Sequence, residues 1–375
     1  MNKKVKKLLA AGLSLAMVLT LFGCNTAQET GETAETEDTE KESSVNVDTK
    51  SAMSDSEWQM AKDPSEYKLS CYWPGPDTFF DSYVLEGLKA FEEDYGVTVD
   101  YQIGTEWTQN VENQTIEAKL AEGYNLFYIF GADTTGANAL YKEIYDAGGK
   151  VVNYAGLMDD PQESACTLAS DVYSQAYNSA KELISLMGEE GEIINVLEQL
   201  SDVNTQKRQQ GIEDAVAEYP NVSIVQTVAD ISTADEGYEK ISDAISANAG
   251  AKGIITTGGT ASIGLANALS DYYGTSEDAE HIFAASMDQS DEVMGAIENG
   301  YIDYTVAQNG WAMGYVSPLI LCMMEDGWEP NEFGQFIDTG YIFINQENAD
   351  SWQTDIEEKA VELIKTLEAD WFTLS

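Results

Sequence analysis

The alternation of short apolar runs with longer amphipathic segments constrains the fold of this chain most strongly. From Tyr67 onward, runs of four to eight residues rich in Val, Ile and aromatic side chains alternate with segments whose apolar residues recur at helical spacing. Strands that alternate with helices form parallel sheets, because each parallel connection needs a crossover. We therefore predict an α/β fold.

The pattern gives about ten strands, which is many for one open sheet. Two smaller doubly wound sheets fit the usual size of a domain better, so we predict two Rossmann-like lobes that bind at the carboxyl ends of their strands. A last strand and an amphipathic helix follow within residues 340–367. The other predicted strands are 67–73, 97–103, 124–131, 150–156, 192–198, 222–228, 252–257, 281–287 and 301–308.

The first residues have the pattern of an export signal. A basic MNKKVKK segment precedes the apolar run LLAAGLSLAMVLTLF, which ends in Leu21-Phe22-Gly23-Cys24. This ending resembles a bacterial lipobox. The resemblance implies cleavage of residues 1–23, a diacylglycerol on the Cys24 sulfur, and a position on the extracytoplasmic face of the cell membrane. The alternative is an ordinary signal peptide with a chance cysteine.

Residues 24–62 have the composition of a disordered acidic tether. The segment is rich in Thr, Glu, Ser and Asp and has almost no large apolar residue before Trp58. Such a segment buries too little apolar surface to offset the entropy of ordering. We therefore expect the folded part of the chain to begin near Tyr67.

The charge of the chain excludes several partners. It carries 66 acidic against 19 basic residues, a formal net charge of −47. Nucleic-acid binding needs Lys and Arg to neutralise phosphates, so we predict no nucleic-acid partner. Docking on anionic lipids through a basic patch is excluded for the same reason.

Cysteine and histidine usage indicates neither metal nor catalytic chemistry. After Cys24 only Cys71, Cys166 and Cys322 remain, without a CxxC pair, so we predict three buried small apolar residues. The single histidine, His281, leads a predicted strand and is expected to be partly exposed. We predict no metal site, no cofactor and no catalytic residues, and therefore not an enzyme.

The stretch TTGGTASIGLANAL, residues 256–269, comes close to the TGxxxGxG turn of short-chain dehydrogenases. That turn belongs after the first strand of the fold, whereas this one comes late in the chain. The dehydrogenase also needs a downstream Tyr-x-x-x-Lys. The two lysines after Gly264, Lys359 and Lys365, have Asp355 and Val361 at the tyrosine position. The dehydrogenase interpretation therefore fails.

Four motifs, in order along the chain, resemble the type I periplasmic-binding-protein family, ribose-binding-like branch. They are GPDTFFDSYVLEGLKAFEEDYGV, VNTQKRQQGIEDAVAEYPN, AASMDQSDEVMGAIENGYIDYTVAQNGWAMGY and IDTGYIFINQEN. The resemblance covers about 300 residues. It implies two lobes joined by a hinge of three crossovers, with a ligand trapped between them by closure.

The resemblance also implies where the lobes are divided. Lobe one would comprise residues 67–170 and 309–337, and lobe two residues 171–308 and 338–375. The chain would cross near residues 169–171, 308–310 and 337–341.

Planar polar groups and aromatic faces are the expected contacts of a sugar-like ligand. Asp288, Gln308 and Arg208 match ligand-binding positions of the family, and Asn153 falls where many members have Asp. For the aromatic residues and for Asp77, roles in the core or as a helix cap stay open as alternatives. The full set of candidates is Asp77, Phe79, Phe80, Trp107, Asn153, Arg208, Asp288, Gln308 and Trp311.

Two glycines depart from the family pattern. Gly258 and Gly259 align with an Asn-Asp pair that often meets the ligand in relatives. Glycine offers no side chain for such contacts, and backbone N–H groups at a helix N-terminus take their place. We expect either room for a larger ligand or a site for an anionic group.

The resemblance implies a solute-binding lipoprotein that delivers a small, sugar-like molecule to an ABC permease. The chain has no GxxxxGK[ST] motif, so the ATPase of the importer must be another chain. We expect a monomer. A binding protein that presents its ligand to a membrane receptor, or one that takes a nucleoside or an autoinducer, are the alternatives.

Overall fold

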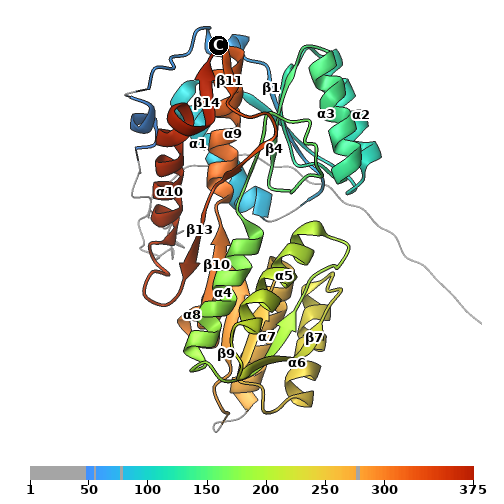
Figure 1. Cartoon of the computed structure of the whole chain (residues 1–375), viewed down its shortest axis with the longest axis vertical. Helices are drawn as coiled ribbons and strands as arrows, with labels where there is room; N and C mark the ends of the chain where they lie inside the picture. Colours follow the sequence, from blue (N-terminus) through green and yellow to red (C-terminus); the bar gives the residue numbers. More distant parts are fainter. Residues whose placement is uncertain (1–47, 55, 77–78, 276–278) are drawn as a thin grey trace, which may run out of the picture. The chain divides into compact units, whose positions relative to one another are not determined.

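The computed structural model describes residues 48–54, 56–76, 79–275 and 279–375. Within these residues the chain forms two six-stranded sheets and a two-stranded sheet (Figure 1). The predicted α/β fold is confirmed. The predicted leader, Cys24 and residue Asp77 lie outside the described residues.

The first sheet is parallel throughout, in the order β12-β5-β4-β3-β1-β2. Its inner strands are buried on both faces, as expected where helices cover a parallel sheet on both sides. The sequence pattern did not predict β5 and β12. The strands are β1 (Leu69–Trp73), β2 (Val99–Ile103), β3 (Leu126–Ile129), β4 (Lys150–Tyr154), β5 (Cys166–Ala169) and β12 (Gln335–Asp338).

Helices cover both faces of this sheet. Side chains of β3 alternate, so that Tyr128 joins the core under α1 (Leu85–Tyr95) and α9 (Gly310–Glu325), whereas Phe127 faces the other side. That side is covered by α2 (Gln109–Ala121) and α3 (Thr134–Asp146), which lie side by side in Figure 1. The π-helical turn η3 (Phe80–Val84) leads into α1. We call this sheet and its helices lobe one.

The second sheet has the order β13-β10-β9-β8-β6-β7, with only β13 antiparallel to its neighbour. Helices α4 and α5 pack on one face and α6, α7 and α8 on the other. We call this part lobe two. Its elements are β6 (Gly191–Val196), β7 (Val222–Val228), β8 (Gly253–Thr256), β9 (Phe283–Met287), β10 (Tyr304–Gln308), β13 (Tyr341–Ile344), α4 (Val172–Leu186), α5 (Val203–Ala217), α6 (Ala234–Ala247), α7 (Gly259–Thr275) and α8 (Asp291–Glu298).

Three connections join the two sheets, and buried hydrogen bonds tie them together. The Ser170 hydroxyl lies 3.0 Å from the Thr339 hydroxyl and accepts a hydrogen bond from the backbone N–H of Asn309 at 3.2 Å. The Asn309 amide in turn donates to the carbonyls of Thr339 and Ile356, each at 3.1 Å. The three connections therefore form one hydrogen-bonded unit, which we call the hinge cluster.

The C-terminal segment packs differently from the prediction, which places residues 338–375 in lobe two. After β13, helix α10 (Trp352–Thr366) buries a stripe at helical spacing in the core of lobe one, beside α9. The turn η4 (Leu367–Trp371) then leads to β14 (Phe372–Leu374), which pairs with β11 (Trp328–Pro330). The apolar stripe of α10 fits the α9 surface, so only β13 of this segment joins lobe two.

The predicted disordered tether also ends earlier than expected. Residues 48–54 and 56–62, which we call the strap, form the short helix η1 (Lys50–Met53) and then follow lobe one to η2 (Pro64–Glu66). The Trp58 ring is 3% exposed, and its Nε1 donates to Asp326 at 2.9 Å. The backbone N–H groups of Glu57 and Trp58 donate to the Glu368 carboxylate, each at 2.8 Å. One large aromatic side chain therefore fixes an otherwise polar segment.

The three described cysteines, Cys71, Cys166 and Cys322, are free and buried, as predicted. Burial raises the pKa of the Cys71 thiol to about 12, so this thiol stays protonated at neutral pH. His281 is partly exposed just before β9, also as predicted, and its Nε2 lies 3.2 Å from Asp303.

Trp58→Ala should destabilise the protein by about 3 kcal/mol or more, because it empties a buried aromatic site and leaves Asp326 without the indole donor. Urea unfolding of the full chain measures the change. Trp107→Ala is the matched control, since Trp107 is 50% exposed, and it should cost less than about 1 kcal/mol. Equal losses of unfolding free energy in the two variants would show that Trp58 stabilises the protein no more than an exposed tryptophan does.

Candidate ligand-binding site

A cavity of about 210 Å³ is lined by residues of both lobes. Its walls come from loops at the carboxyl ends of parallel strands, where a doubly wound fold exposes backbone and side chains to a ligand. Lobe one contributes mainly aromatic rings, and lobe two contributes mainly polar groups. The cavity therefore has an aromatic wall and a polar wall.

The aromatic wall is built around Trp73 at the end of β1. Phe130, just after β3, meets the Trp73 ring edge-on with centroids 4.8 Å apart, and Phe79 stacks on it at 6.1 Å. Tyr83 lies next to Phe79 at 5.6 Å. These rings hold one another in place, so the wall offers a rigid apolar face to an occupant.

Arg208 supplies the positive charge of the polar wall. It lies on α5 and is 6% exposed, yet among the described residues no carboxylate is within ion-pair distance of it. Its Nε is buried without a hydrogen-bond partner. A buried N–H donor without a partner is costly, and a guanidinium is suited to bind paired oxygens of a ligand. Arg208 is therefore positioned to bind an occupant of the cavity.

Asp288 and Gln308 form a pair at the ends of β9 and β10. The Gln308 amide donates to Asp288 Oδ1 at 2.9 Å, and the Thr305 hydroxyl donates to the Asp288 carbonyl. The backbone of Asp288 is left-handed, with φ of 61°, a conformation that Asp tolerates better than most residues. The turn thus aims this carboxylate at the cavity.

The carboxyl group of Glu198 lies against Gly258, the first residue of the Gly258-Gly259 pair. This residue follows β6, and its Oε1 accepts a hydrogen bond from the backbone N–H of Ala261 at 3.2 Å, at the start of α7. Burial raises the pKa of the Glu198 carboxyl, while the N–H groups of Ala261 and Thr260 and the charge of Arg208 lower it less. The anionic group expected at this helix N-terminus is therefore supplied by the protein itself.

One hydrogen bond joins the two walls directly. The Tyr83 hydroxyl of lobe one donates to the backbone carbonyl of Gln289 in lobe two at 3.0 Å. Both residues line the cavity. Tyr83 also packs close to Gly310, which follows Asn309 of the hinge cluster, so this contact joins the lobes near the hinge.

Four of the nine predicted site residues line the cavity, and four others do not. Phe79, Arg208, Asp288 and Gln308 line the cavity together. Trp107 does not line it, although its ring packs edge-on against Phe130 at 5.1 Å. Asp77 lies outside the described residues.

Three predicted residues lie in the core of lobe one instead. Phe80 is 1% exposed and packs against Trp73, because η3 turns its ring inward. Asn153 is buried with its amide bonded to Tyr141, Thr167 and the Gly156 carbonyl, so it links β4 to its neighbours. Trp311 stacks on Tyr315 of its own helix at 4.9 Å.

Sequence reasoning missed several cavity residues. Trp73 and Glu198 each end a predicted strand, which was a usable signal, since strand ends form the site in this fold class. Asn204 also lines the cavity, whereas Asp202 caps α5. Phe130 lies at the end of the predicted strand 124–131 and carried the same signal, whereas Tyr83 and Gln289 carried none that was distinct.

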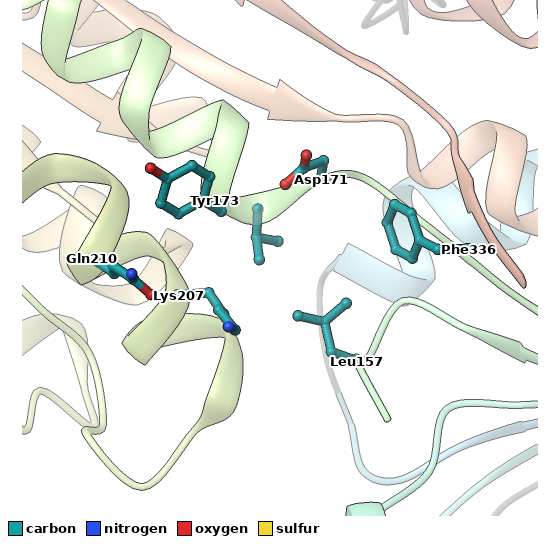
Figure 2. Close-up of a pocket in the computed structure, with 7 residues that line it drawn as sticks. Leu157, Asp171, Tyr173, Lys207, Gln210 and Phe336 are labelled. Carbon is teal, nitrogen blue, oxygen red and sulfur yellow. The ribbon is translucent and has the colours of Figure 1, made fainter. Parts of the chain in front are cut away.

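A second hollow, of about 440 Å³, lies outside this cavity (Figure 2). Leu157 and Phe336 face Tyr173 and Lys207 across it. The Tyr173 hydroxyl is bonded to Asp214 at 3.0 Å, and Asp171 caps α4. Two of the four polar side chains in its lining are thus engaged in hydrogen bonds within the protein.

The sequence matches the family described as the periplasmic binding protein domain over residues 71–327. The chain belongs to this family. The predicted family resemblance is thereby confirmed. Among the described residues, no helix is long and apolar enough to cross a membrane.

Two curated relatives are named D-apiose import binding protein. The protein of Actinobacillus succinogenes is 30% identical over 145 residues, which are 38% of this chain and 45% of the relative. That of Paraburkholderia graminis is 22% identical over 204 residues, 53% of this chain and 62% of the relative. The matches thus span less than two thirds of these relatives.

Solved structures share the fold at low identity. An ABC transporter solute-binding protein of Burkholderia graminis, in complex with D-arabinose, gives a TM-score of 0.69 at 20% identity and covers 77% of this chain and 99% of its own. The arabinose-binding protein AraP of Geobacillus stearothermophilus gives 0.65 at 19% identity, covering 75% and 97%.

Glu112 supports the loop that carries Phe130. Its carboxylate is fully buried on α2 and accepts hydrogen bonds from the backbone N–H of Ala132 at 2.6 Å and from Gln109 at 3.0 Å. Burial raises the pKa of Glu112 to about 7, against an ordinary value of 4.5. The charged form is therefore disfavoured in the folded state.

Glu112→Gln should make stability less sensitive to pH. Because the folded pKa is raised, the unfolded chain loses this proton first, so the wild type loses stability as pH rises from about 4.5 to about 7. The variant should gain about 2 kcal/mol relative to wild type between pH 5 and pH 8 in urea unfolding. Glu117→Gln, exposed on the same helix, is the control. The same pH dependence in Glu112→Gln and wild type would contradict the assignment.

Proposed function

We propose that this protein is an extracytoplasmic solute-binding protein of an ABC importer that captures a small sugar or sugar-like polyol by closure of two lobes. The observation that carries the proposal is the buried Arg208, whose Nε has no hydrogen-bond partner, in a cavity between an aromatic and a polar wall. The family is one of binding proteins, and the site geometry supports a ligand of this chemistry.

The two walls match the two kinds of surface on a sugar. Sugar rings present C–H faces that pack on aromatic rings, and hydroxyls that bond to planar polar groups. Trp73 and Phe130 suit the first kind of surface, and Arg208, Asp288 and Gln308 suit the second. A cavity of about 210 Å³ has room for roughly seven water molecules, which favours a monosaccharide over a longer chain.

The relatives support this ligand class. Two are named for import of D-apiose, and neighbours in structure are complexes with D-arabinose and D-allose. In such a system the binding protein delivers its ligand to a permease, with the ATPase on a separate chain, and we propose the same partners here.

We further propose that Cys24 carries a lipid that holds the protein at the outer side of the membrane. The proposal rests on the basic and apolar N-terminal pattern that ends in Leu-Phe-Gly-Cys. The strap would attach such an anchor to lobe one through Trp58 and Glu368. Lobe two would then be the lobe that moves.

Arg208→Met should abolish most ligand binding without destabilising the empty protein. Titration calorimetry of the full chain against D-apiose, D-arabinose, D-allose and myo-inositol should find at least one sugar that binds wild type. The variant should bind it at least 30-fold more weakly, because a charged hydrogen-bond donor is removed. Its melting temperature should stay close to that of wild type, since the loss of an unbonded buried N–H offsets the loss of the charge that acts on Glu198.

Lys207→Met is the control, because Lys207 lies on the same helix but outside the cavity. A wild-type chain that binds no sugar of the panel, but does bind a nucleoside or an amino acid, would contradict the proposed ligand class. Unchanged sugar affinity in Arg208→Met would remove Arg208 from the site.

Tyr83→Phe should speed ligand release about 3- to 10-fold, because it removes one hydrogen bond between the lobes, to the Gln289 carbonyl. The association rate should change little if the contact forms only when the lobes close on the ligand. Stopped-flow tryptophan fluorescence separates the two rates. Tyr101→Phe is the control, as Tyr101 is 40% exposed on β2. A slower association with unchanged release would argue against a role in closure.

A further inference from the structure

Glu198 and Gly258 compete for the same space. A Cβ atom at Gly258 would lie 2.3 Å from the carboxyl carbon of Glu198 and 2.3 and 2.6 Å from its two oxygens, far inside contact distance. The backbone of Gly258 does not have a positive φ, so an alanine there would be strained only by this clash. The absence of a side chain at position 258 therefore makes room for the carboxylate at the cavity wall.

The Glu198 carboxylate retains capacity to accept hydrogen bonds from an occupant. A carboxylate has about four acceptor positions, and the backbone N–H groups of Ala261 and Thr260 use two of them. Among the described residues, no Lys or Arg forms an ion pair with it. Two further buried acceptors in the lining, Gln289 Oε1 and Asn204 Oδ1, have no hydrogen-bond partner. This wall is therefore rich in acceptors that need donors.

The charges of the lining point the same way. Two carboxylates, Glu198 and Asp288, stand on either side of the double glycine, and Arg208 is the cation of the lining. An occupant with hydroxyl groups can donate to all of these acceptors and also accept from Arg208. A sugar acid would gain one pairing with Arg208 but face repulsion from two carboxylates, and like-charge contact is an effective means of rejecting a ligand.

We propose that Glu198 determines the ligand specificity of this site. Its carboxylate accepts hydrogen bonds from the hydroxyl groups of an uncharged polyhydroxy ligand and repels the corresponding acid. Gly258 has no side chain and so leaves room for this carboxylate. The inference rests on the proposed function and deepens it. The two glycines after β8 present no side chain to the ligand, and Glu198, from the loop after β6, supplies one in their place. The ligand class is an uncharged monosaccharide or polyol.

The test compares one sugar with its acid. Titration calorimetry on the full chain uses the best-binding member of D-apiose, D-arabinose, D-allose and myo-inositol, together with D-galactose and D-galacturonate as a matched neutral and acidic pair. Wild type should bind D-galactose at least 100-fold more tightly than D-galacturonate, because the two differ in the charged group alone. Glu198→Gln should reduce that ratio at least 10-fold, because the repulsive charge is removed while the shape is kept. Glu192→Gln, an exposed glutamate on β6, should leave the ratio unchanged.

A second variant tests the geometry without any ligand. Gly258→Ala should lower the melting temperature, and adding Glu198→Ala should restore part of it, since the clash partner is gone. If the effects of the two substitutions on the melting temperature simply add, Glu198 and Gly258 do not compete for the same space. Unchanged selectivity in Glu198→Gln would overturn the specificity role while the proposed function stands. A wild-type chain that binds none of the sugars would overturn both the proposed function and this inference.

Discussion

Parallel strand pairing is the constraint on which the rest of this structure depends. A parallel strand must be followed by a crossover, so the carboxyl ends of all strands in a sheet meet at one edge. Trp73, Phe130, Glu198, Asp288 and Gln308 are far apart in the sequence, yet each stands at or just after such an end. Backbone pairing between parallel strands thus brings the residues of the cavity lining together, independently of contacts between their side chains.

Much of this arrangement could be predicted from the sequence, because hydrophobic periodicity reports burial on one or both faces of an element. The runs that became β8 and β9 are mostly apolar, and they are buried strands. Periodicity did not reveal β5 and β12, which together form one edge of the first sheet. It also failed for α10, whose stripe was visible but whose partner surface, α9, was not.

The site could be predicted only in part, for a related reason. The family motifs mark the positions of Arg208, Asp288 and Gln308, so these residues could be predicted. Asn153 also occupies a marked position, but its side chain is hydrogen-bonded to Tyr141 and Thr167 in the core. Which of two neighbouring rings faces the cavity depends on local backbone twist: Phe79 faces it, and η3 turns Phe80 away. Glu198 was visible at a strand end, but its link to Gly258 exists only in three dimensions.

The return of the chain to lobe one has a consequence for biosynthesis. Phe372 belongs to the same core as Leu69 and Trp58, so lobe one cannot complete its core until residue 372 has been made. Lobe two, apart from β13, is built from one continuous stretch ending at Gln308. The second lobe in sequence can therefore fold first, which reverses the usual order of domains during synthesis. The core that contains Leu69 of β1 lacks Phe372 until the end of synthesis, so lobe one stays incomplete while most of the chain is being made.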